Sequence, residues 1–591
     1  MTSKATALAR LLPAIRWCIG LVLLVPLTVQ AATLEYAVKG IKGERLRNVQ
    51  AYLGDPPQTD QDRLNFVISA RAKVREALQA LGYYNPDITL EVQRTDPVWS
   101  LDITVDQGEP VRIRDIDIEI TGAAANDDVM MGLLLDTGLD AGDRMHHGAF
   151  ENFRTKLLST GQQRGYLRGR FSLSRVEVNA EAETADIFLH YQSGPRFRFG
   201  EIRIDYTLID KELLDSLCPF QPGDYFDQTS LRKLQSNLQK TNYFSSVIIQ
   251  PVRGREYGEV VPIDVRLEAA KRHNLELGVG YSTDTEERVS MTWRTPRINR
   301  FGHSQITRIE YSPVNPSGRF TYSIPVVNPL VDVVQLWGML GENEYGDLKS
   351  QQLEAGVRRE IKEGKWVYSY SLRGLNESWD DLNRSPSHDY LLLGGAVSSR
   401  QYEGSLVDPE GGFSQLYTLE GGAQQLASDI DLLRFTAELR YIVTPWPRHR
   451  LVMRSELGAV EIANGDRSDL APSLSFFAGG NESIRGYAYQ SIGHEEKFVR
   501  ADGTTRTVVV GGNRLAIASF EYQYYFTDKW RGALYVDGGD AFDESHFDAK
   551  IGAGFGIHYM TPVGAVRFEL ANSVSEKNPD WYFHLAIGAE F

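Results

Sequence analysis

The feature that most constrains the fold is a period-two alternation of apolar and polar residues through the last half of the chain. Leu433 and Phe435, for example, alternate with Arg434 and Thr436. Segments of about ten residues alternate in this way between turn residues, which is typical of transmembrane barrel strands. A soluble β-sandwich with one wet face is the alternative, but the segments are too many and too evenly aromatic for it. No stretch after the first 31 residues resembles a membrane helix. We therefore predict that 269–591 forms an all-β transmembrane barrel of about 16 antiparallel strands.

The first 31 residues resemble a secretory signal sequence. Three basic residues precede a mostly apolar run from Trp17 to Val29, and this run is too short to span a bilayer as a helix. We therefore predict a signal peptide at 1–31 and disfavour a retained anchor. Removal of the three basic residues changes the net charge from −15 to about −18. Such acidity argues against a nucleic-acid partner.

Residues 33–268 contain three diverged copies of a unit of about 80 residues, within the size range of ordinary domains. Each copy predicts a strand, two helices and two further strands, which is an α+β arrangement. The clearest marker is the end of the second helix, where Gly82, Gly165 and Asn242 stop the helix as C-terminal capping residues do. The predicted units are 32–108, 109–194 and 195–268.

A glycine-rich stretch from Gly479 to Ser491 lies in a connection between two predicted strands, at 462–511, that is far longer than a hairpin requires. Glycine lets a backbone bend sharply and approach another surface, and aromatic side chains favour partial burial. The stretch therefore predicts a compact loop rather than a solvated turn. At its centre are Ile484, Arg485, Gly486 and Tyr487.

Alternation along residues 530–539 directs Tyr535 and Asp537 toward the barrel lumen. A carboxylate inside a barrel needs a partner, and the guanidinium of Arg485 can provide paired hydrogen bonds. We predict that the long loop folds into the lumen and that Arg485 pairs with Asp537. Because a lumen is wet, we expect this pair to be neither fully exposed nor fully desolvated.

Other patterns suggest chemistry but favour plain barrel structure. Residues 552–556 resemble a glycine-rich nucleotide loop, yet no helix follows and glycine alternates with apolar residues, which predicts a strand with a small inner face. No nucleophile elbow or metal-ligand spacing accompanies the inward polar residues, and Cys218 belongs to no Cys/His cluster. These inward residues are His558, His584, Glu521 and Glu569. We therefore predict a protein without catalytic residues, metal or cofactor, and not an enzyme.

Several motifs together resemble those of the BamA-type outer-membrane assembly superfamily. The residues Ile484 to Tyr487 resemble its lumen-loop motif, with Tyr487 where many members have phenylalanine. Its partner-strand motif is matched by Tyr535, Asp537 and Gly539. Its strand and turn signals are matched by Gly511, Gly512, Glu521 and the turn 561–564. The repeated unit resembles the POTRA domain, and three such units point to the TamA branch of the superfamily.

This resemblance implies a non-enzymatic assembly factor in the outer membrane, with its POTRA domains in the periplasm. Such a factor helps β-rich proteins, including autotransporters, insert into or cross the membrane. The implied partners are a TamB-like periplasmic protein anchored in the inner membrane, unfolded outer-membrane protein clients, and outer-membrane lipid. The alternative function is a passive two-partner-type secretion pore for soluble substrates.

A lateral seam between the first and last barrel strands is the expected site of action. Glycine weakens a strand, and a poorly paired strand edge can accept a strand from another chain. The glycines on these strands have an alternative explanation, which is barrel curvature alone. The predicted seam residues are Leu275, Gly278, Gly280, Gly588 and Phe591.

Overall fold

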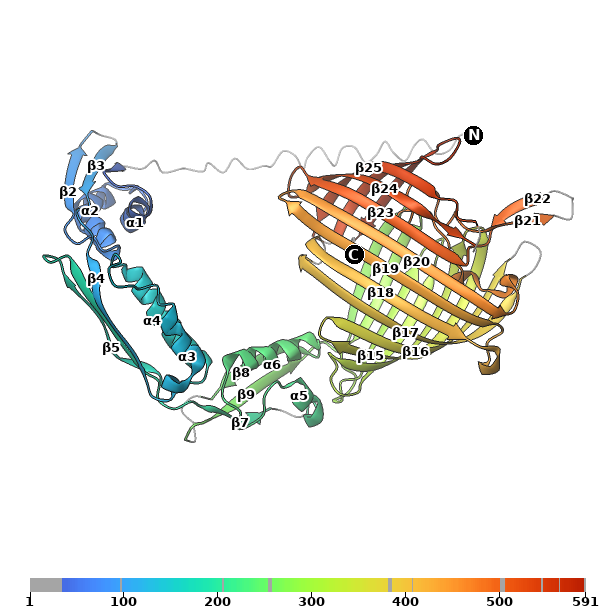
Figure 1. Cartoon of the computed structure of the whole chain (residues 1–591), viewed down its shortest axis with the longest axis horizontal. Helices are drawn as coiled ribbons and strands as arrows, with labels where there is room; N and C mark the ends of the chain where they lie inside the picture. Colours follow the sequence, from blue (N-terminus) through green and yellow to red (C-terminus); the bar gives the residue numbers. More distant parts are fainter. Residues whose placement is uncertain are drawn as a thin grey trace, which may run out of the picture. The chain divides into compact units, whose positions relative to one another are not determined.

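The computed structural model describes residues 34–95, 98–204, 207–252, 258–380, 385–405, 408–499, 505–543, 546–562 and 564–588. The predicted signal peptide, Val563 of the predicted turn and the predicted seam residue Phe591 lie outside the described residues. The chain divides into two compact units (Figure 1). Of the described residues, the first unit extends to Arg198 and includes 225–228 and 258–260, and the second unit holds the remainder.

Three α+β modules precede the barrel, each built on a three-stranded sheet in the orders β1-β3-β2, β4-β6-β5 and β7-β9-β8. The first module comprises β1 (Leu34–Lys39), α1 (Glu44–Leu53), α2 (Asp60–Ala80), β2 (Asp87–Gln93) and β3 (Trp99–Asp106). The second comprises β4 (Arg112–Thr121), η1 (Ala123–Asn126), α3 (Asp128–Gly132), η2 (Leu133–Leu135), α4 (His147–Gln163), β5 (Arg170–Asn179) and β6 (Thr184–Gln192). The third comprises β7 (Arg198–Arg203), α5 (Lys211–Leu217), α6 (Gln228–Lys240), β8 (Phe244–Pro251) and β9 (Val260–Ala269).

The glycine or asparagine at each helix end also joins one module to the next part of the chain. Gly82, Gly165 and Asn242 have φ angles of 89°, 94° and 59°, a left-handed conformation that ends a helix. The amide of Val111 donates to the Gly82 carbonyl at 2.8 Å, and that of Phe197 donates to the Gly165 carbonyl at 2.9 Å. A side chain at Gly165 would meet the carbonyl oxygen of Phe226 at 2.7 Å, so glycine permits this close approach.

In the second module, Asp127 is a buried carboxylate that fixes the start of α3. Its side chain accepts hydrogen bonds from the amides of Val129 and Met130 at the helix N-terminus. It also accepts from Arg164 at 2.8 Å and from the Tyr166 hydroxyl at 2.9 Å. Burial by itself would raise the pKa of the Asp127 carboxyl, but the hydrogen bonds from Arg164 and Tyr166 outweigh burial and hold that pKa below its ordinary value.

Sixteen antiparallel strands close into a barrel, which confirms the predicted fold class and strand number. Two-residue to six-residue turns join most neighbours, and the order in the sheet follows the order in the chain. The strands are β10 (Asn274–Ser282), β11 (Glu286–Thr295), β12 (Ser304–Tyr311), β13 (Ser317–Pro325), β14 (Asp332–Tyr345), β15 (Leu348–Glu363), β16 (Trp366–Asp380), β17 (Ser387–Gly404), β18 (Pro409–Gly422), β19 (Asp431–Trp446), β20 (His449–Asn464), β23 (Arg514–Tyr525), β24 (Trp530–Phe542), β25 (Lys550–Thr561), β26 (Gly564–Ser573) and β27 (Trp581–Gly588). A short helix, η3 (Gln424–Leu426), lies between β18 and β19.

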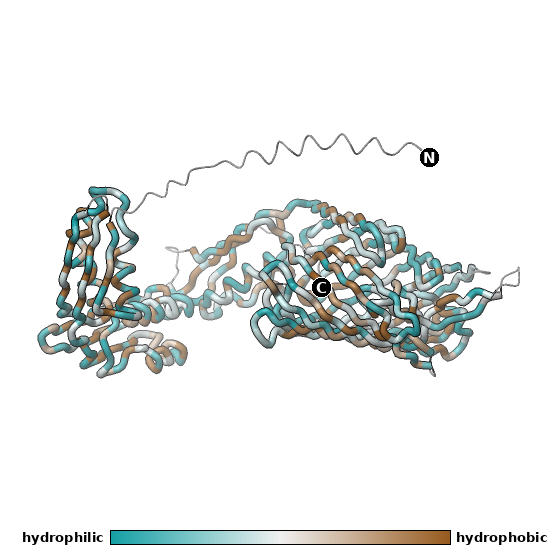
Figure 2. The backbone as a smooth tube through the Cα atoms, turned by 90° about the horizontal axis from the view of Figure 1, so that it is seen from above, coloured by the Kyte–Doolittle hydropathy of each residue, from teal (hydrophilic) through white to brown (hydrophobic). Residues whose placement is uncertain are grey.

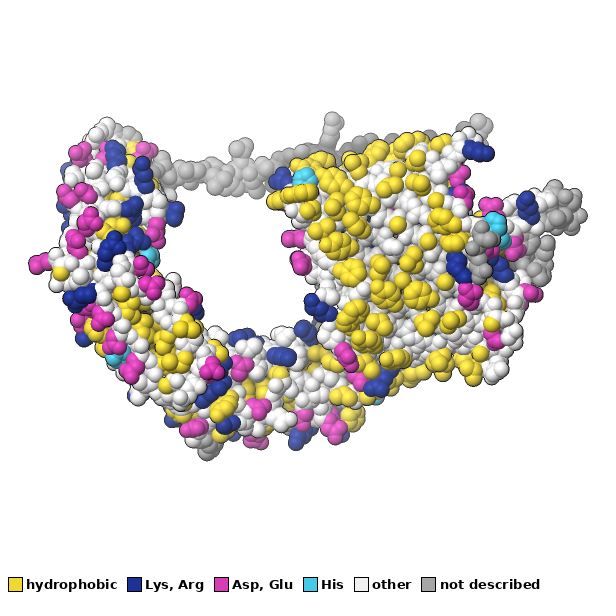
Figure 3. All heavy atoms as spheres, in the orientation of Figure 1, with side chains coloured by type: hydrophobic (Ala, Val, Ile, Leu, Met, Phe, Trp, Pro, Cys, Tyr) yellow, Lys and Arg dark blue, Asp and Glu magenta, His cyan; other side chains and the backbone are white. Residues whose placement is uncertain are grey.

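The alternation in the sequence becomes an apolar outer face. Leu277, Val279, Leu433 and Phe435 are exposed on the barrel wall, whereas Arg434 is partly buried inside it. Figure 2 shows hydrophobic and hydrophilic residues interleaved along the strands. On the face seen in Figure 3, apolar side chains gather over the strands, and acidic and basic side chains gather at the two rims. Among the described residues, no helix combines the length and apolar character that crossing a bilayer requires.

The third module is hydrogen-bonded to the turns that join barrel strands at one rim. The Tyr243 hydroxyl donates to the carbonyl of Gly302 at 2.7 Å, in the turn between β11 and β12. Asn328, in the turn between β13 and β14, donates to the carbonyl of Ser216 at 2.7 Å. Tyr243 follows the helix-end marker of this module, so the third copy of that marker contacts the barrel.

The long connection between β20 and β23, at residues 465–513, contains short elements of its own. These are η4 (Arg467–Asp469), η5 (Pro472–Leu474), β21 (Glu495–Val499) and β22 (Thr505–Val509). The hairpin of β21 and β22 projects from the barrel (Figure 1). Isolated bridges pair Phe476 with Gly512 and Ala478 with Ile492. Backbone pairing therefore also fixes parts of the connection that lie outside the hairpin.

Candidate functional site

The loop is packed inside the barrel by a hydrophobic core. Ile484 is fully buried and Tyr487 is nearly so. They belong to one cluster with residues of the barrel wall, including Leu348, Trp379 and Leu392. A loop with this much buried apolar surface is held by the hydrophobic effect as well as by polar contacts.

Arg485 lies at the centre of the site and contacts three carboxylates. Its Nε donates to Oδ2 of Asp537 at 2.7 Å, and its Nη2 donates to Oδ1 of the same residue at 2.9 Å. Its Nη1 donates to Glu521 at 2.7 Å and to Glu569 at 3.3 Å. The guanidinium also lies over the ring of Tyr535, 3.4 Å from the ring centroid. The paired geometry on Asp537 is the arrangement that only a planar guanidinium can make.

The expected partial exposure of the pair of Arg485 and Asp537 is wrong. Arg485 is 1% exposed and Asp537 is 0% exposed. The loop holds Arg485 against the wall, where its guanidinium lies over the Tyr535 ring and its carbonyl lies against Gly552, so little of the pair can reach solvent. Asp537 also accepts a hydrogen bond from the backbone amide of Arg485 at 3.1 Å and from the hydroxyl of Ser519 at 2.5 Å. The carboxylate is therefore desolvated but fully hydrogen-bonded, which buried charges require.

Glycines on the wall make room for the loop backbone. A side chain at Gly552, on β25, would collide with the carbonyl oxygen of Arg485. Gly486 has a φ angle of 96°, and a side chain there would lie 2.9 Å from the backbone of Asn572 on β26. Within 552–556, the segment predicted to have a small inner face, Gly552 is thus the residue against which the Arg485 backbone lies.

The remaining predicted loop and strand residues lie around this centre. The Tyr487 hydroxyl is within 2.8 Å of the Ser575 hydroxyl, which provides the hydrogen bond expected of a buried tyrosine. Gly511 has a φ angle of 86°, and Gly512 bridges to Phe476, so both serve the return of the loop to β23. Gly539 has a φ angle of 155° in β24 and is packed against the backbone of β23.

A buried chain of polar groups extends from this centre toward the opposite rim of the barrel. His558 lies 2.9 Å from Glu569 through Nε2. Nδ1 of His558 accepts a hydrogen bond from Nε of Arg531 at 3.1 Å, so its proton is on Nε2 and is donated to Glu569. Arg531 in turn donates to Asp408 at 2.9 Å.

The atoms of Glu521, His558 and Glu569 are close enough to ligate a metal ion, within 4.8 Å of one another. The guanidinium of Arg485 already contacts both of these carboxylates, at 2.7 and 3.3 Å. The arrangement therefore suits a cationic side chain delivered by the loop. The contacts of Arg485 with these carboxylates can anchor the loop to the wall.

Over the described residues, the first and last strands meet at a seam with few backbone contacts. In the described residues, β10 and β27 share one register pair, Ser282 with Ala586, whereas β10 and β11 share nine. The amide of Thr283 adds a hydrogen bond to the carbonyl of Leu585 at 3.1 Å. Leu275 is exposed on the outer face. Gly588 ends β27 and its surroundings are outside the description, as is Phe591.

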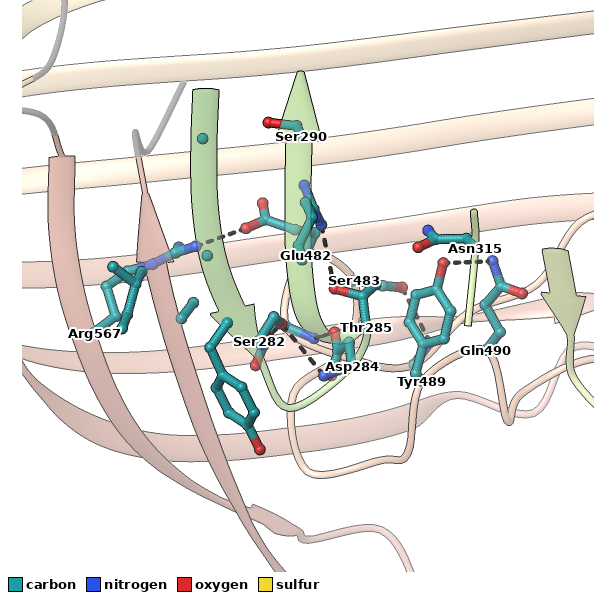
Figure 4. A pocket seen from close by; sticks show the side chains of 18 of the residues that line it. Ser282, Asp284, Thr285, Ser290, Asn315, Glu482, Ser483, Tyr489, Gln490 and Arg567 are labelled. Carbon is teal, nitrogen blue, oxygen red and sulfur yellow. Dashed lines mark hydrogen bonds and ion pairs between the residues drawn. The ribbon is translucent and has the colours of Figure 1, made fainter. Parts of the chain in front are cut away.

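A cavity of about 830 Å³ lies behind the seam (Figure 4). Gly278 and Gly280 line it, and so do Ala586 and residues of the loop tip, including Glu482. Arg567 donates to Glu482 at 2.8 Å across this space. The glycines of the first strand, which are expected to weaken it, line this cavity.

Several residues of the site are not evident from the sequence as members of it. Alternation along β26 and β25 directs Glu569 and His558 into the lumen, but it does not indicate that Glu569 contacts Arg485 or that His558 contacts Glu569. The contact of Asn481 with Asp284 joins residues 197 positions apart, and neither lies in a recognised motif. A carboxylate in the turn directly after the first strand was the one available signal for it.

Comparisons with known proteins agree with this architecture. A family model described as the Omp85 superfamily domain matches residues 270–591. A model described as POTRA domain TamA domain 1 matches residues 35–107, and one described as surface antigen variable number repeat matches residues 197–269. The structure is similar to the crystal structure of BamA from Haemophilus ducreyi lacking POTRA domains 1–3, with a TM-score of 0.71 at 15% identity. That similarity covers 81% of this chain and 99% of the other.

Two curated proteins, both described as outer membrane protein assembly factor BamA, are similar in sequence. The one from Nitratidesulfovibrio vulgaris is 24% identical over 362 residues, which is 58% of this chain and 44% of that protein. The one from Neisseria meningitidis serogroup B is 24% identical over 228 residues, which is 36% of this chain and 28% of that protein. The matches thus span less than half the length of either relative.

Proposed function

Because this chain belongs to the Omp85 superfamily, we propose that it is a TamA-like assembly factor that helps β-rich proteins insert into or cross the outer membrane. Its barrel lies in the outer membrane and its POTRA domains lie in the periplasm. We assign these domains to 32–108, 109–194 and 195–268. The proposed clients are unfolded outer-membrane proteins such as autotransporters, and the proposed periplasmic partner is a TamB-like protein anchored in the inner membrane.

The observation that carries this proposal is the weak seam. One register pair closes the described part of the β10 and β27 edges, whereas β26 and β27 share eight. A strand edge with unpaired backbone groups can accept a strand from another chain. Inside a membrane such pairing is favoured, because water does not satisfy the free backbone groups there.

The test is a reversible tether across the seam. Ser282→Cys with Ala586→Cys places two thiols at the register pair, where directly opposed residues are close enough for a disulfide. Cys218→Ser removes the one free cysteine of the described residues. We expect the oxidised protein to remain folded but to lose client assembly, and the reduced form of the same variant to retain it. Full assembly by the oxidised protein would contradict the proposal.

The alternative is a passive pore for soluble substrates. The loop core and the Arg485 anchor occupy the lumen, which favours a closed barrel over an open one. Planar-bilayer conductance separates the two functions. A large and stable conductance of the unmodified protein would favour the pore.

A further inference from the structure

The loop tip, residues 480–487, contacts both edges of the seam. On one side the backbone amide of Asn481 donates to Oδ2 of Asp284 at 2.7 Å. Asp284 lies in the turn that directly follows β10. On the other side the amide of Gly486 donates to Nε2 of His584, on β27, at 3.4 Å. Six residues of one loop, 481–486, therefore bridge the turn after the first strand and the last strand.

The contact on the β10 side is built from several groups. The Asn481 side-chain amide donates to the hydroxyl of Ser282 at 3.2 Å and to that of Thr283 at 3.4 Å. Gly480 has a φ angle of 102°, and a side chain there would lie 2.8 Å from the Asp284 carboxylate. The close approach of loop and turn is thus specified by backbone geometry as well as by side chains.

The position of this contact matters because Ser282 and Thr283 make backbone contacts across the described part of the seam. Ser282 forms the register pair with Ala586, and Thr283 donates to Leu585. The loop tip therefore holds the few residues on which closure of the described seam depends. Figure 4 shows Asp284 and Ser282 beside the cavity, with Glu482 of the loop tip reaching toward Arg567 of β26.

We propose that the loop tip is a clasp that holds the seam shut, with Asn481 on Asp284 and Gly486 on His584 as its two ends. Withdrawal of the tip frees the end of β10 and opens the seam from that end. Since Arg485 lies between the two ends, the buried anchor and the clasp move together. This inference rests on the proposed function only in that client assembly is the process for which the seam would open. The clasp itself is a property of the protein without a client.

The experiment measures the seam directly. Spin labels at Val279 and Phe583, which are exposed on the outer faces of β10 and β27, report the separation of the strands in full-length Cys218→Ser protein in phospholipid nanodiscs. Asp284→Ala removes the acceptor for the Asn481 amide, and loss of a hydrogen bond to a charged group should raise the ratio of open to closed seam about tenfold or more. Asp284→Asn should have a smaller effect, because its amide oxygen still accepts.

The matched control is Glu287→Gln, which neutralises an exposed carboxylate at the start of β11. If Asp284→Ala fails to fold, Asn481→Ala provides the test, since it removes only the side-chain bonds to Ser282 and Thr283. A distance distribution equal to that of the control in the folded variant overturns the clasp. A wider separation of the strands in the variant supports the clasp. If the seam widens and client assembly also survives the oxidised tether described above, the clasp is supported and the proposed function is contradicted.

Discussion

Replacing Arg485 by alanine should release the loop tip from the barrel wall without unfolding the barrel. The substitution leaves Asp537, Glu521 and Glu569 without their shared cation in a buried site. Breaking a buried ion pair by removing one partner costs about 3–5 kcal/mol. The stranded carboxylates keep other contacts, so we expect a cost near the lower end of that range. These contacts are Ser519 and Arg454 on Asp537, Gln523 on Glu521, and His558 on Glu569.

The reverse substitution should cost less. Asp537→Ala leaves Arg485 with Glu521 and Glu569, so the loss is that of hydrogen bonds to a charged group, about 1.5–3 kcal/mol. The double variant should cost less than the sum of the two single variants, because both remove the same contact. Arg485→Lys should restore part of the loss, since an ammonium group lacks the planar fork that contacts Asp537 twice.

Amide hydrogen exchange of residues 480–490 in the full-length protein measures this local release. A loss of about 3 kcal/mol corresponds to exchange that is roughly 150-fold faster. The matched control is Arg506→Ala, an identical change in the same loop that removes a pair with Asp347 whose side chains are 42% and 35% exposed. An exposed pair contributes at most about 1 kcal/mol. Exchange in Arg485→Ala no faster than in the control, or strictly additive losses in the double variant, would refute the reasoning.

Two further predictions concern other parts of the molecule. Gly552→Ala should expel the loop, because the added methyl group collides with the Arg485 carbonyl. Gly538→Ala is the control, since its methyl group meets only atoms at 3.8 Å or beyond, and amide hydrogen exchange of the loop compares the two variants. Asp127→Asn should destabilise the second module at neutral pH by about 1–3 kcal/mol. Since the folded-state pKa of Asp127 is lowered, its contribution is present above about pH 4 and disappears as pH falls through that lowered pKa. Urea unfolding followed by helical circular dichroism, at pH 7 and at a series of lower pH values, should show the difference in stability between wild type and Asp127→Asn shrink below about pH 4. Exposed Asp128→Asn is the control.

The barrel could be predicted from the sequence because lipid imposes a strict rule on every strand. Leu433 and Phe435 must alternate with inward residues such as Arg434, and this pattern is visible within ten residues. The inward direction of Asp537 follows from the same rule applied to β24. The helix-end residues Gly82, Gly165 and Asn242 were visible for a similar reason, because a left-handed conformation restricts the choice of residue.

Burial and long-range contacts were not visible in the same way. The exposed fraction of Arg485 depends on how the loop packs against wall residues such as Leu348 and Trp379, which are more than 100 positions away. A wet lumen was a reasonable expectation for a barrel of this size, but it does not hold where a loop brings its own apolar core. The contact of Asn481 with Asp284 depends on the closure of the barrel, and no local pattern encodes the meeting of the first and last strands.

The energetics of the seam connect the loop to the strands. Backbone groups on the seam edge of β10 that lack a partner would each cost several kcal/mol in hydrocarbon. The cavity behind Gly278 and Gly280 reduces that cost, since its lining includes polar groups such as Ser290 and Arg288 and it has room for solvent. A strand arriving from another chain would replace solvent with peptide hydrogen bonds. Pairing with such a strand would therefore stabilise the edge of β10 when the seam is open. Over the described residues, the contacts across the seam lie at the end of β10, where Asn481 binds, so we expect these contacts to contribute to closure.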